Sequence, residues 1–87
     1  MSYFLDFSQQ AQRDIEFFKK TGNKAVLKKL YILLNELTEH PNTGTGKPEQ
    51  LKYILAGTWS RRINQEHRLI YEVNEDSIYI LTTKGHY

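Results

Sequence analysis

Cysteine is missing from all 87 residues, so disulfides and thiolate-bound metal ions are excluded, and a reducing compartment suits the chain. The three histidines, His40, His67 and His86, include no pair at metal-ligand spacing. We therefore expect no metal and no other cofactor. The segment Gly44-Thr45-Gly46-Lys47 lacks the spacing and the following Ser or Thr of a phosphate-binding P-loop, which argues against nucleotide hydrolysis.

Long apolar runs are also missing. No stretch approaches the roughly 20 apolar residues that a membrane helix needs, and the start Met-Ser-Tyr-Phe has no basic segment of the kind that opens a secretion signal. We expect a cytoplasmic protein that does not associate with membranes. A chain of 87 residues is expected to form one domain, residues 1–87, around one modest core.

The chain has little excess of one charge: its formal net charge is only +2. The charge is unevenly distributed, however. From Lys47 to Arg68 five basic residues accompany two acidic ones, whereas from Leu69 onward Lys84 is outnumbered by three acidic residues. A basic segment with interleaved aromatic residues is typical of a surface that contacts RNA. The plainer interpretation is a solvated surface.

The first half of the chain has the pattern of one strand and two helices. Apolar residues alternate over residues 3–7, which predicts a strand, and recur at helical spacing over residues 9–21 after Ser8, a good N-cap. Gly22 suits the left-handed position that ends a helix. A second helix, capped by Asn23, carries a broad leucine stripe and reaches His40-Pro41. These helices form a hairpin.

The second half changes to period two. Residues 42–49 contain Gly44, Gly46 and Pro48 and are expected to form a loop. Strands are predicted over residues 59–63, 68–73 and 77–83, joined by short polar turns. The fold class is therefore α+β in the order β-α-α-β-β-β. A helical hairpin packs on one face of a small, twisted, mainly antiparallel sheet.

Alternation also assigns side chains to the two faces of this sheet. If Leu69 and Tyr71 face the helices, Arg68 lies on the open face, and the preceding strand then places Arg62 beside it. The same alternation turns Arg61 toward the helices. Period two alone gives no reason for that, unless Arg61 lies at a sheet edge, extends its head group to water, or follows a bulge.

Four motifs follow one another along the chain. They are Gly46-Lys47-Pro48-Glu49-Gln50-Leu51-Lys52, Gly57-Thr58-Trp59-Ser60-Arg61-Arg62-Ile63, Glu66-His67-Arg68-Leu69-Ile70-Tyr71 and His86-Tyr87. Together they resemble the Txe/YoeB family of the RelE/ParE toxin superfamily. The likeness covers the chain from about Gly46 onward, and the strand-helix-helix order before it agrees.

This resemblance implies a metal-independent endoribonuclease, an mRNA interferase that is the toxin of a type II toxin-antitoxin system. Such a toxin cleaves mRNA in the ribosomal A site by attack of a ribose 2′-hydroxyl, and so inhibits translation. By resemblance Glu49 is the general base, Arg62 and Arg68 hold the phosphate, and His86 is the general acid. Tyr87 completes the catalytic set. The RNA-binding set adds Lys47, Lys52 and Lys84 to Arg62.

Each of these residues also has a plainer interpretation. Glu49 would be a solvated loop residue or a helix cap, the arginines would be surface charge, and His86-Tyr87 would be a frayed end. His67 is expected in a turn, with a structural role or exposed to solvent. The occurrence of the whole set in its family order favours the catalytic interpretation.

The resemblance also implies partners. They are a cognate antitoxin of the YefM/Axe type, the 70S ribosome with its mRNA, a second copy of the free toxin, and operator DNA bound indirectly through the antitoxin. Two alternatives remain open. One is a ParE-like, non-catalytic toxin that binds DNA gyrase, and the other is a regulatory binding module such as a co-repressor.

Overall fold

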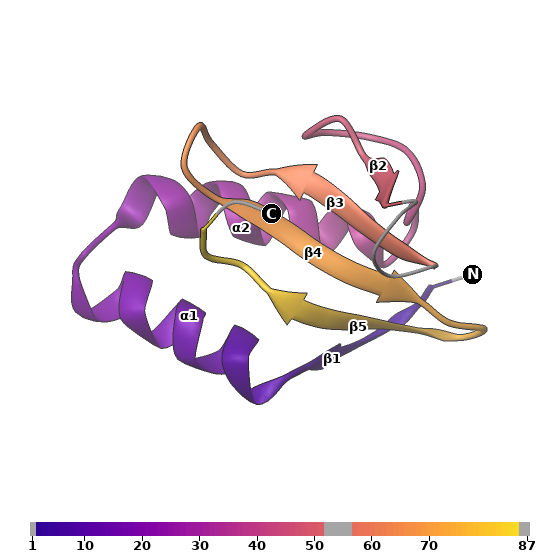
Figure 1. The fold of residues 1–87 in the computed structure, drawn as a ribbon, viewed down its shortest axis with the longest axis horizontal. Coiled ribbons are helices and arrows are strands. Elements are labelled where there is room, and N and C mark those ends of the chain that lie inside the picture. The colour runs from indigo at the N-terminus through magenta and orange to yellow at the C-terminus, as the bar shows by residue number, and fades with distance from the viewer. Residues whose placement is uncertain (1, 52–56, 86–87) are drawn as a thin grey trace.

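The computed structural model describes residues 2–51 and 57–85 of the chain. Its elements are β1 (Phe4–Phe7), α1 (Gln9–Lys20), α2 (Lys24–Leu37), β2 (Glu49–Leu51), β3 (Thr58–Arg62), β4 (Arg68–Val73) and β5 (Ser77–Thr82). The strands form one sheet in the order β1-β5-β4-β3-β2, in which only the β1–β5 pair is parallel among the described strands. Both helices lie on one side of the sheet (Figure 1). The predicted α+β class is confirmed.

The helical hairpin begins and turns where the capping residues predict. The Ser8 hydroxyl accepts the Ala11 backbone N–H at 3.0 Å, and the Asn23 side chain accepts the Val26 N–H at 3.3 Å. Between the helices Gly22 has a φ of 69°, the left-handed conformation that glycine adopts without strain. A short turn is therefore enough to join the two helices.

The core lies between the hairpin and the sheet. It is formed by the apolar stripe of α2, by Phe18 of α1, and by the helix-facing residues of β4 and β5. Leu69 and Tyr71 of β4 and Ile78 and Ile80 of β5 are completely buried. The predicted alternation in these strands is confirmed, because the residues between them face the other side of the sheet.

One strand lies where a loop was expected. Glu49 begins β2, a three-residue edge strand that pairs antiparallel with β3, so the order is β-α-α-β-β-β-β. Three residues are too few for period two to appear in the sequence. The loop before β2 lies close against β3, since the Arg62 N–H donates to the Gly46 carbonyl at 2.8 Å. A Cβ on Gly46 would lie 2.8 Å from the Arg62 carbonyl oxygen, so only glycine fits there.

Arg61 faces the helices, as alternation predicts, and is fully buried. Its guanidinium donates to Glu36 at 3.2 Å and to the Tyr71 hydroxyl at 3.1 Å. It also donates to the backbone carbonyls of His40, Thr43 and Thr45. The register needs no bulge in β3; the irregularity lies between β4 and β5, at Ile70 and Tyr71. Arg61 is therefore tolerated because the loop after α2 supplies acceptors for its N–H groups.

Candidate functional site

The open face of the sheet brings together side chains from three neighbouring strands. Glu49 of β2 lies opposite Ser60 of β3, and Arg62 of β3 lies opposite Arg68 of β4. Directly opposed residues of an antiparallel pair project from the same face. The structure thus places three of the predicted catalytic residues, Glu49, Arg62 and Arg68, on one surface, as alternation required for the two arginines.

Arg68 is the best-fixed member of this group. Its Nε donates to the Ser60 hydroxyl at 2.6 Å, and its Nη2 lies 3.6 Å from Oε2 of Glu49. The Arg68 side chain is 18 % exposed, whereas that of Glu49 is 69 % exposed. A guanidinium held at two points, next to an accessible carboxylate, is a suitable cradle for a phosphate group. Ser60 itself is buried.

Arg62 is exposed and lies directly across the strand pair from Arg68. Like charges that face each other in this way destabilise a sheet unless something neutralises them. Arg68 has the carboxylate of Glu49 nearby, but Arg62 has no salt bridge to any residue within 2–51 or 57–85. The pair is therefore arranged to gain free energy from an anion on the open face.

The loop before β2 sets the position of Glu49. Lys47 has a φ of 52°, unusual for a residue with a side chain, and it lies between Gly46, which contacts β3, and Pro48. Tight backbone geometry two residues before Glu49 restricts where its carboxylate can lie. Lys47 is exposed at the same sheet edge.

On the opposite face, the Arg61 network holds the start of this loop. The Thr45 hydroxyl and backbone N–H both donate to Glu36, and these hydrogen bonds, together with nearby Arg61, hold the pKa of the Glu36 carboxyl below its ordinary value. Burial raises the pKa of the Tyr71 phenol, whose hydroxyl donates to the Pro41 carbonyl at 2.8 Å. These contacts fix the chain between α2 and β2 from the helix side.

The chain after β5 returns to the Arg68 end of the sheet. The Gly85 carbonyl accepts the Arg68 N–H at 3.0 Å, and the Gly85 N–H donates to Nδ1 of His67 at 2.9 Å. Lys84 is exposed, and its Nζ lies 3.9 Å from the centroid of the Phe17 ring on α1, so it points toward the helices. The remaining predicted site residues, Lys52, His86 and Tyr87, lie outside the described residues.

A second basic surface was missed in the sequence analysis. From Phe17 to Asn35 the chain has five lysines and no acidic residue, more positive charge than the segment from Lys47 to Arg68. The lysines lie at the turn of the helical hairpin, and four of them are exposed: Lys19, Lys20, Lys24 and Lys28. Counting charge over the helices would have found this lysine cluster, which includes Lys29 as its fifth member.

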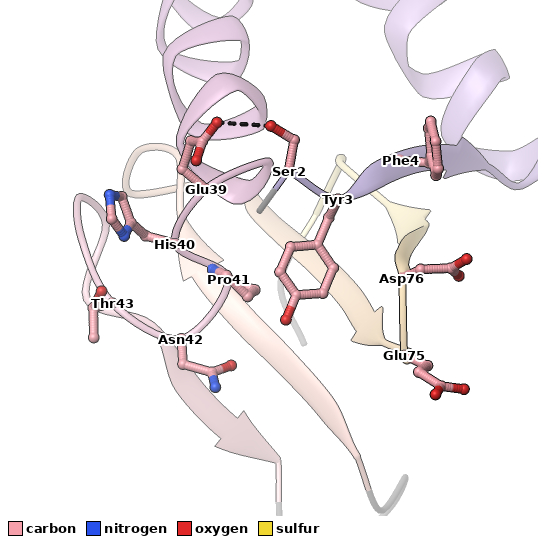
Figure 2. Close-up of a pocket in the computed structure, with 10 residues that line it drawn as sticks. All are labelled: Ser2, Tyr3, Phe4, Glu39, His40, Pro41, Asn42, Thr43, Glu75 and Asp76. Atoms are coloured by element: carbon pink, nitrogen blue, oxygen red, sulfur yellow. Dashed lines mark hydrogen bonds between the residues drawn. The ribbon is translucent and has the colours of Figure 1, made fainter.

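A cavity lies elsewhere, away from the open face. It has a volume of about 730 Å³ and lies at the turn between β4 and β5, the end of these strands away from Arg68 (Figure 2). Its lining includes Glu39, Glu75 and Asp76 and no lysine or arginine. The Tyr3 ring projects into it. Acidic walls repel phosphate, so this cavity is unsuited to RNA, and the open surface around Arg68 is the better candidate.

Metal ligands do not gather in the part of the chain that the structure covers: no three His, Asp or Glu side chains there could hold one ion. Nor does that part contain a helix long and apolar enough to cross a membrane.

Comparison with known proteins identifies the family. A family model described as the YoeB-like toxin of a bacterial type II toxin-antitoxin system matches residues 7–87. The toxin YoeB of Escherichia coli K12 is 41 % identical over 83 residues, which is 95 % of this chain and 98 % of that protein.

Solved structures give the same result. The YoeB dimer from Staphylococcus aureus superposes with a TM-score of 0.89 at 41 % identity, and the alignment covers 100 % of both chains. In the YoeB-YefM complex from the same organism, YoeB superposes with a TM-score of 0.86 at 42 % identity, again over 100 % of both chains. With a family model matched from β1 to residue 87 and relatives of this identity over nearly their full length, the chain belongs to the YoeB-like toxins of bacterial type II toxin-antitoxin systems.

Proposed function

We propose that this toxin is a ribosome-dependent endoribonuclease that cleaves mRNA in the ribosomal A site and thereby stops translation. The observation that carries the proposal is the convergence of one accessible carboxylate and two guanidinium groups on the open face, with Glu49 3.6 Å from Arg68. A protein that only binds its target has no need of a base beside a phosphate cradle.

The reaction we propose is attack of a ribose 2′-oxygen on its own 3′-phosphorus. The bond from O2′ to phosphorus forms while the bond from phosphorus to the departing 5′-oxygen breaks, giving a cyclic 2′,3′-phosphate and a free 5′-hydroxyl. Glu49 takes the 2′-hydroxyl proton, and His86 gives a proton to the departing oxygen. Arg62 and Arg68 stabilise the charge that grows on the phosphoryl oxygens. Tyr87, Lys47 and Lys52 would hold the RNA on either side. Lys84 would have to leave the Phe17 ring to join them.

Binding of substrate would also activate Glu49. In the free protein Arg68 is shared between Ser60 and the Glu49 carboxylate. A phosphate that takes the guanidinium would release the carboxylate to act as a base, because two parallel hydrogen bonds to phosphate are stronger than the single 3.6 Å contact with Glu49. The Ser60 hydroxyl then keeps the guanidinium in place while its partner changes.

Ribosome dependence is supported by the extent of positive surface. A codon-length piece of RNA needs only the open face, whereas the lysine cluster lies on the helical hairpin, outside the sheet. Exposed lysines bind phosphate backbones without regard to sequence. We therefore propose that the lysine cluster rests on ribosomal RNA while the open face receives the A-site codon, which also places the toxin in the cytoplasm.

The direct test is primer extension on mRNA from programmed ribosomes incubated with the purified toxin, with the Glu49→Gln protein as control. We expect a new end within the A-site codon for the wild type and a loss of about 10²–10⁴-fold for the variant. Uncut mRNA at every toxin concentration would refute the proposal. Equal cutting by both proteins would remove Glu49 from the role of base.

Metal independence is tested separately. We propose that arginines provide the electrostatic stabilisation, so cleavage should survive EDTA when magnesium is kept in fixed excess to preserve the ribosomes. If the chemical step proves to need zinc or manganese, Arg62 and Arg68 do not have the assigned role. The gyrase alternative is decided in a supercoiling assay, where a ParE-like inhibitor would block the reaction and a nuclease would not.

The solved relatives also suggest the partners. We propose that an antitoxin like YefM binds this chain, and that the free toxin forms a homodimer, because the YoeB of Staphylococcus aureus has been solved both as a dimer and in complex with YefM. Two exposed aromatic side chains, Phe4 of β1 and Tyr79 of β5, lie on the open face of the sheet and offer apolar anchors. An acidic segment that folds on binding fits such a surface.

The Glu49→Gln protein should copurify with the product of the neighbouring gene when the two are produced together. The same gene product should suppress cleavage by the wild-type toxin. Operator DNA should be retained only by the toxin-antitoxin complex, because we propose that the antitoxin makes the DNA contact. Absence of copurification would remove the antitoxin from the proposal without affecting the nuclease assay.

A further inference from the structure

Gly85 is held at both of its backbone polar groups. Its N–H donates to Nδ1 of His67 at 2.9 Å, and its carbonyl accepts the Arg68 N–H at 3.0 Å. The chain has left the β4–β5 ladder by then, since β5 ends at Thr82. An imidazole nitrogen thus serves as an acceptor where sheet pairing would have used a backbone carbonyl.

The imidazole is itself well fixed. It packs edge-to-face on Phe18, with ring centroids 5.0 Å apart, and Phe18 is completely buried in the core. The His67 backbone N–H donates to the Asn64 side chain at 2.7 Å, and the His67 carbonyl accepts the Ile63 N–H at 3.0 Å. Only 13 % of the His67 side chain is exposed. His67 therefore links the backbone of Gly85 to the core.

The hydrogen bond also assigns the tautomer of the ring. A nitrogen that accepts an N–H carries no proton, so the neutral ring of His67 has its proton on Nε2. Nε2 lies 3.9 Å from the carboxylate of Glu66, whose side chain is 82 % exposed. Because this contact involves Nε2, Nδ1 is left to accept the Gly85 N–H. His67 was expected in a turn, with a structural role or exposed to solvent. Of these two the structural role is observed, because the ring is 13 % exposed and accepts the Gly85 N–H.

A second contact secures the same segment from α1. The buried Asp14 carboxylate accepts the Thr83 N–H and the Thr82 hydroxyl, each at 2.9 Å. The segment from Thr82 to Gly85 is thus tied to α1 at its start and to His67 and Arg68 at its end. Arg68 belongs to the proposed phosphate cradle, and the residue that follows Gly85 in the sequence is His86, the proposed general acid.

We infer that His67 is a positioning residue, which fixes the backbone of Gly85 beside Arg68 and so acts on the proposed general acid, the next residue in the sequence. The inference rests on the proposed function, because it needs His86 to act in the reaction. A misplacement of about 1 Å can cost about 10²-fold in rate. His67 touches no substrate in this scheme and acts only through the backbone that carries the acid.

Three substitutions separate this role from simple packing. His67→Leu keeps an apolar side chain against Phe18 but has no acceptor. His67→Asn places an amide oxygen near the former Nδ1, whereas His67→Gln places its amide near the former Nε2. In single-turnover cleavage on programmed ribosomes we expect the Leu and Gln proteins to slow by about 10²-fold. The Asn protein should recover most of the rate, and ribosome binding should be unchanged in all three.

A wild-type rate for His67→Leu, or an Asn protein no faster than the Gln protein, would overturn the inference. Melting temperatures measured in parallel identify a variant that fails to fold. If His67→Leu unfolds, the comparison of Asn with Gln still decides. In a His86→Gln background His67→Leu should add little further loss, because residues that act as one unit are not additive. A full second loss would show that His67 does not act through the acid.

Failure of the proposed function has a different signature. If the wild type does not cut mRNA at all, nuclear magnetic resonance of the folded protein still reports the contact. The ring nitrogens of His67 should show the Nε2-protonated tautomer, and the Gly85 amide should be protected from exchange in the wild type and the Asn protein but not in the Leu protein. Loss of cleavage with these signals intact rejects the reaction; loss of the signals rejects the contact.

Discussion

Arg61 and Arg62 are neighbours in the chain and have opposite surroundings. Arg61 is fully buried on the helix side, where a carboxylate, a phenol and three backbone carbonyls accept its N–H groups. Arg62 is exposed on the open face, across from another arginine. The same side chain is structural where its acceptors come from the fold and is available to a ligand where they do not. Single substitutions should therefore separate stability from activity.

The largest effect on stability is expected for Arg61→Met. The substitution fills the space but leaves Glu36, the Tyr71 hydroxyl and the loop carbonyls without their donor. Removing one partner of a buried ionic network typically costs about 3–5 kcal/mol of unfolding free energy. Urea denaturation should show this loss with an unchanged slope. A loss below about 1 kcal/mol would mean that water replaces the guanidinium and that Arg61 is not the support we describe.

Arg62→Ala is expected to give the opposite result. Its free energy of unfolding should stay within about 0.5 kcal/mol of wild type, because exposed side chains contribute little. The single-turnover cleavage rate should fall by about 10²–10³-fold, the usual effect of removing one group that stabilises transition-state charge. Arg62→Lys retains charge without the planar fork and serves as the matched control. If Ala at this position cleaves normally, the cradle consists of Arg68 alone.

A smaller effect is expected from the lysine cluster. Replacing both Lys20 and Lys24 by Gln should weaken binding to ribosomes and reduce the slope of log affinity against log salt by about two, one for each lost phosphate contact. The Lys→Arg pair at the same positions should keep the slope. Cleavage by ribosome-bound toxin should not change. A slope unaltered by the Gln pair would exclude the lysine cluster from the ribosome contact.

The smallest effect concerns pH and the helix-side network. Hydrogen bonds from Thr45 and the charge of Arg61 lower the pKa of Glu36 below its ordinary value of 4.5, so ionised Glu36 favours the folded state. Its contribution is present above pH 4.5 and is lost as the pH falls through the lower, folded-state pKa. Glu36→Gln should therefore flatten the acid limb of the stability curve, measured by urea denaturation at several pH values. Parallel curves for the two proteins would contradict this assignment.

Much of the fold could be predicted because apolar residues recur at regular spacing in its helices and strands. The leucine stripe of α2 and the alternation in β4 have periods that show in the sequence, and they assign Arg62 and Arg68 to the open face. β2 could not be found this way, since three residues carry no period. Its location depends on Gly46, whose close contact with the backbone of β3 has no pattern along the chain.

Contacts between backbone and isolated side chains were equally hidden. The partners of Arg61 are mostly carbonyl groups, which every residue possesses, so no residue type identifies them in advance. The same holds for His67, whose partner is the N–H of Gly85. Asp14 lies on the buried side of α1, where the helical pattern gives no reason for a carboxylate, and its partners are 68 and 69 residues away along the chain.

The parallel pairing of β1 with β5 joins the first strand of the sheet to the last one in the chain. Phe4 lies opposite Ser77, so β1 cannot pair until residues 77–80 of β5 have been synthesised. Such long-range pairing makes folding late and slow compared with that of a helical bundle. Arg68 is also translated well before Gly85, which it must meet. The proposed cleavage of mRNA needs the completed sheet, so we expect it to begin only after these distant segments have paired.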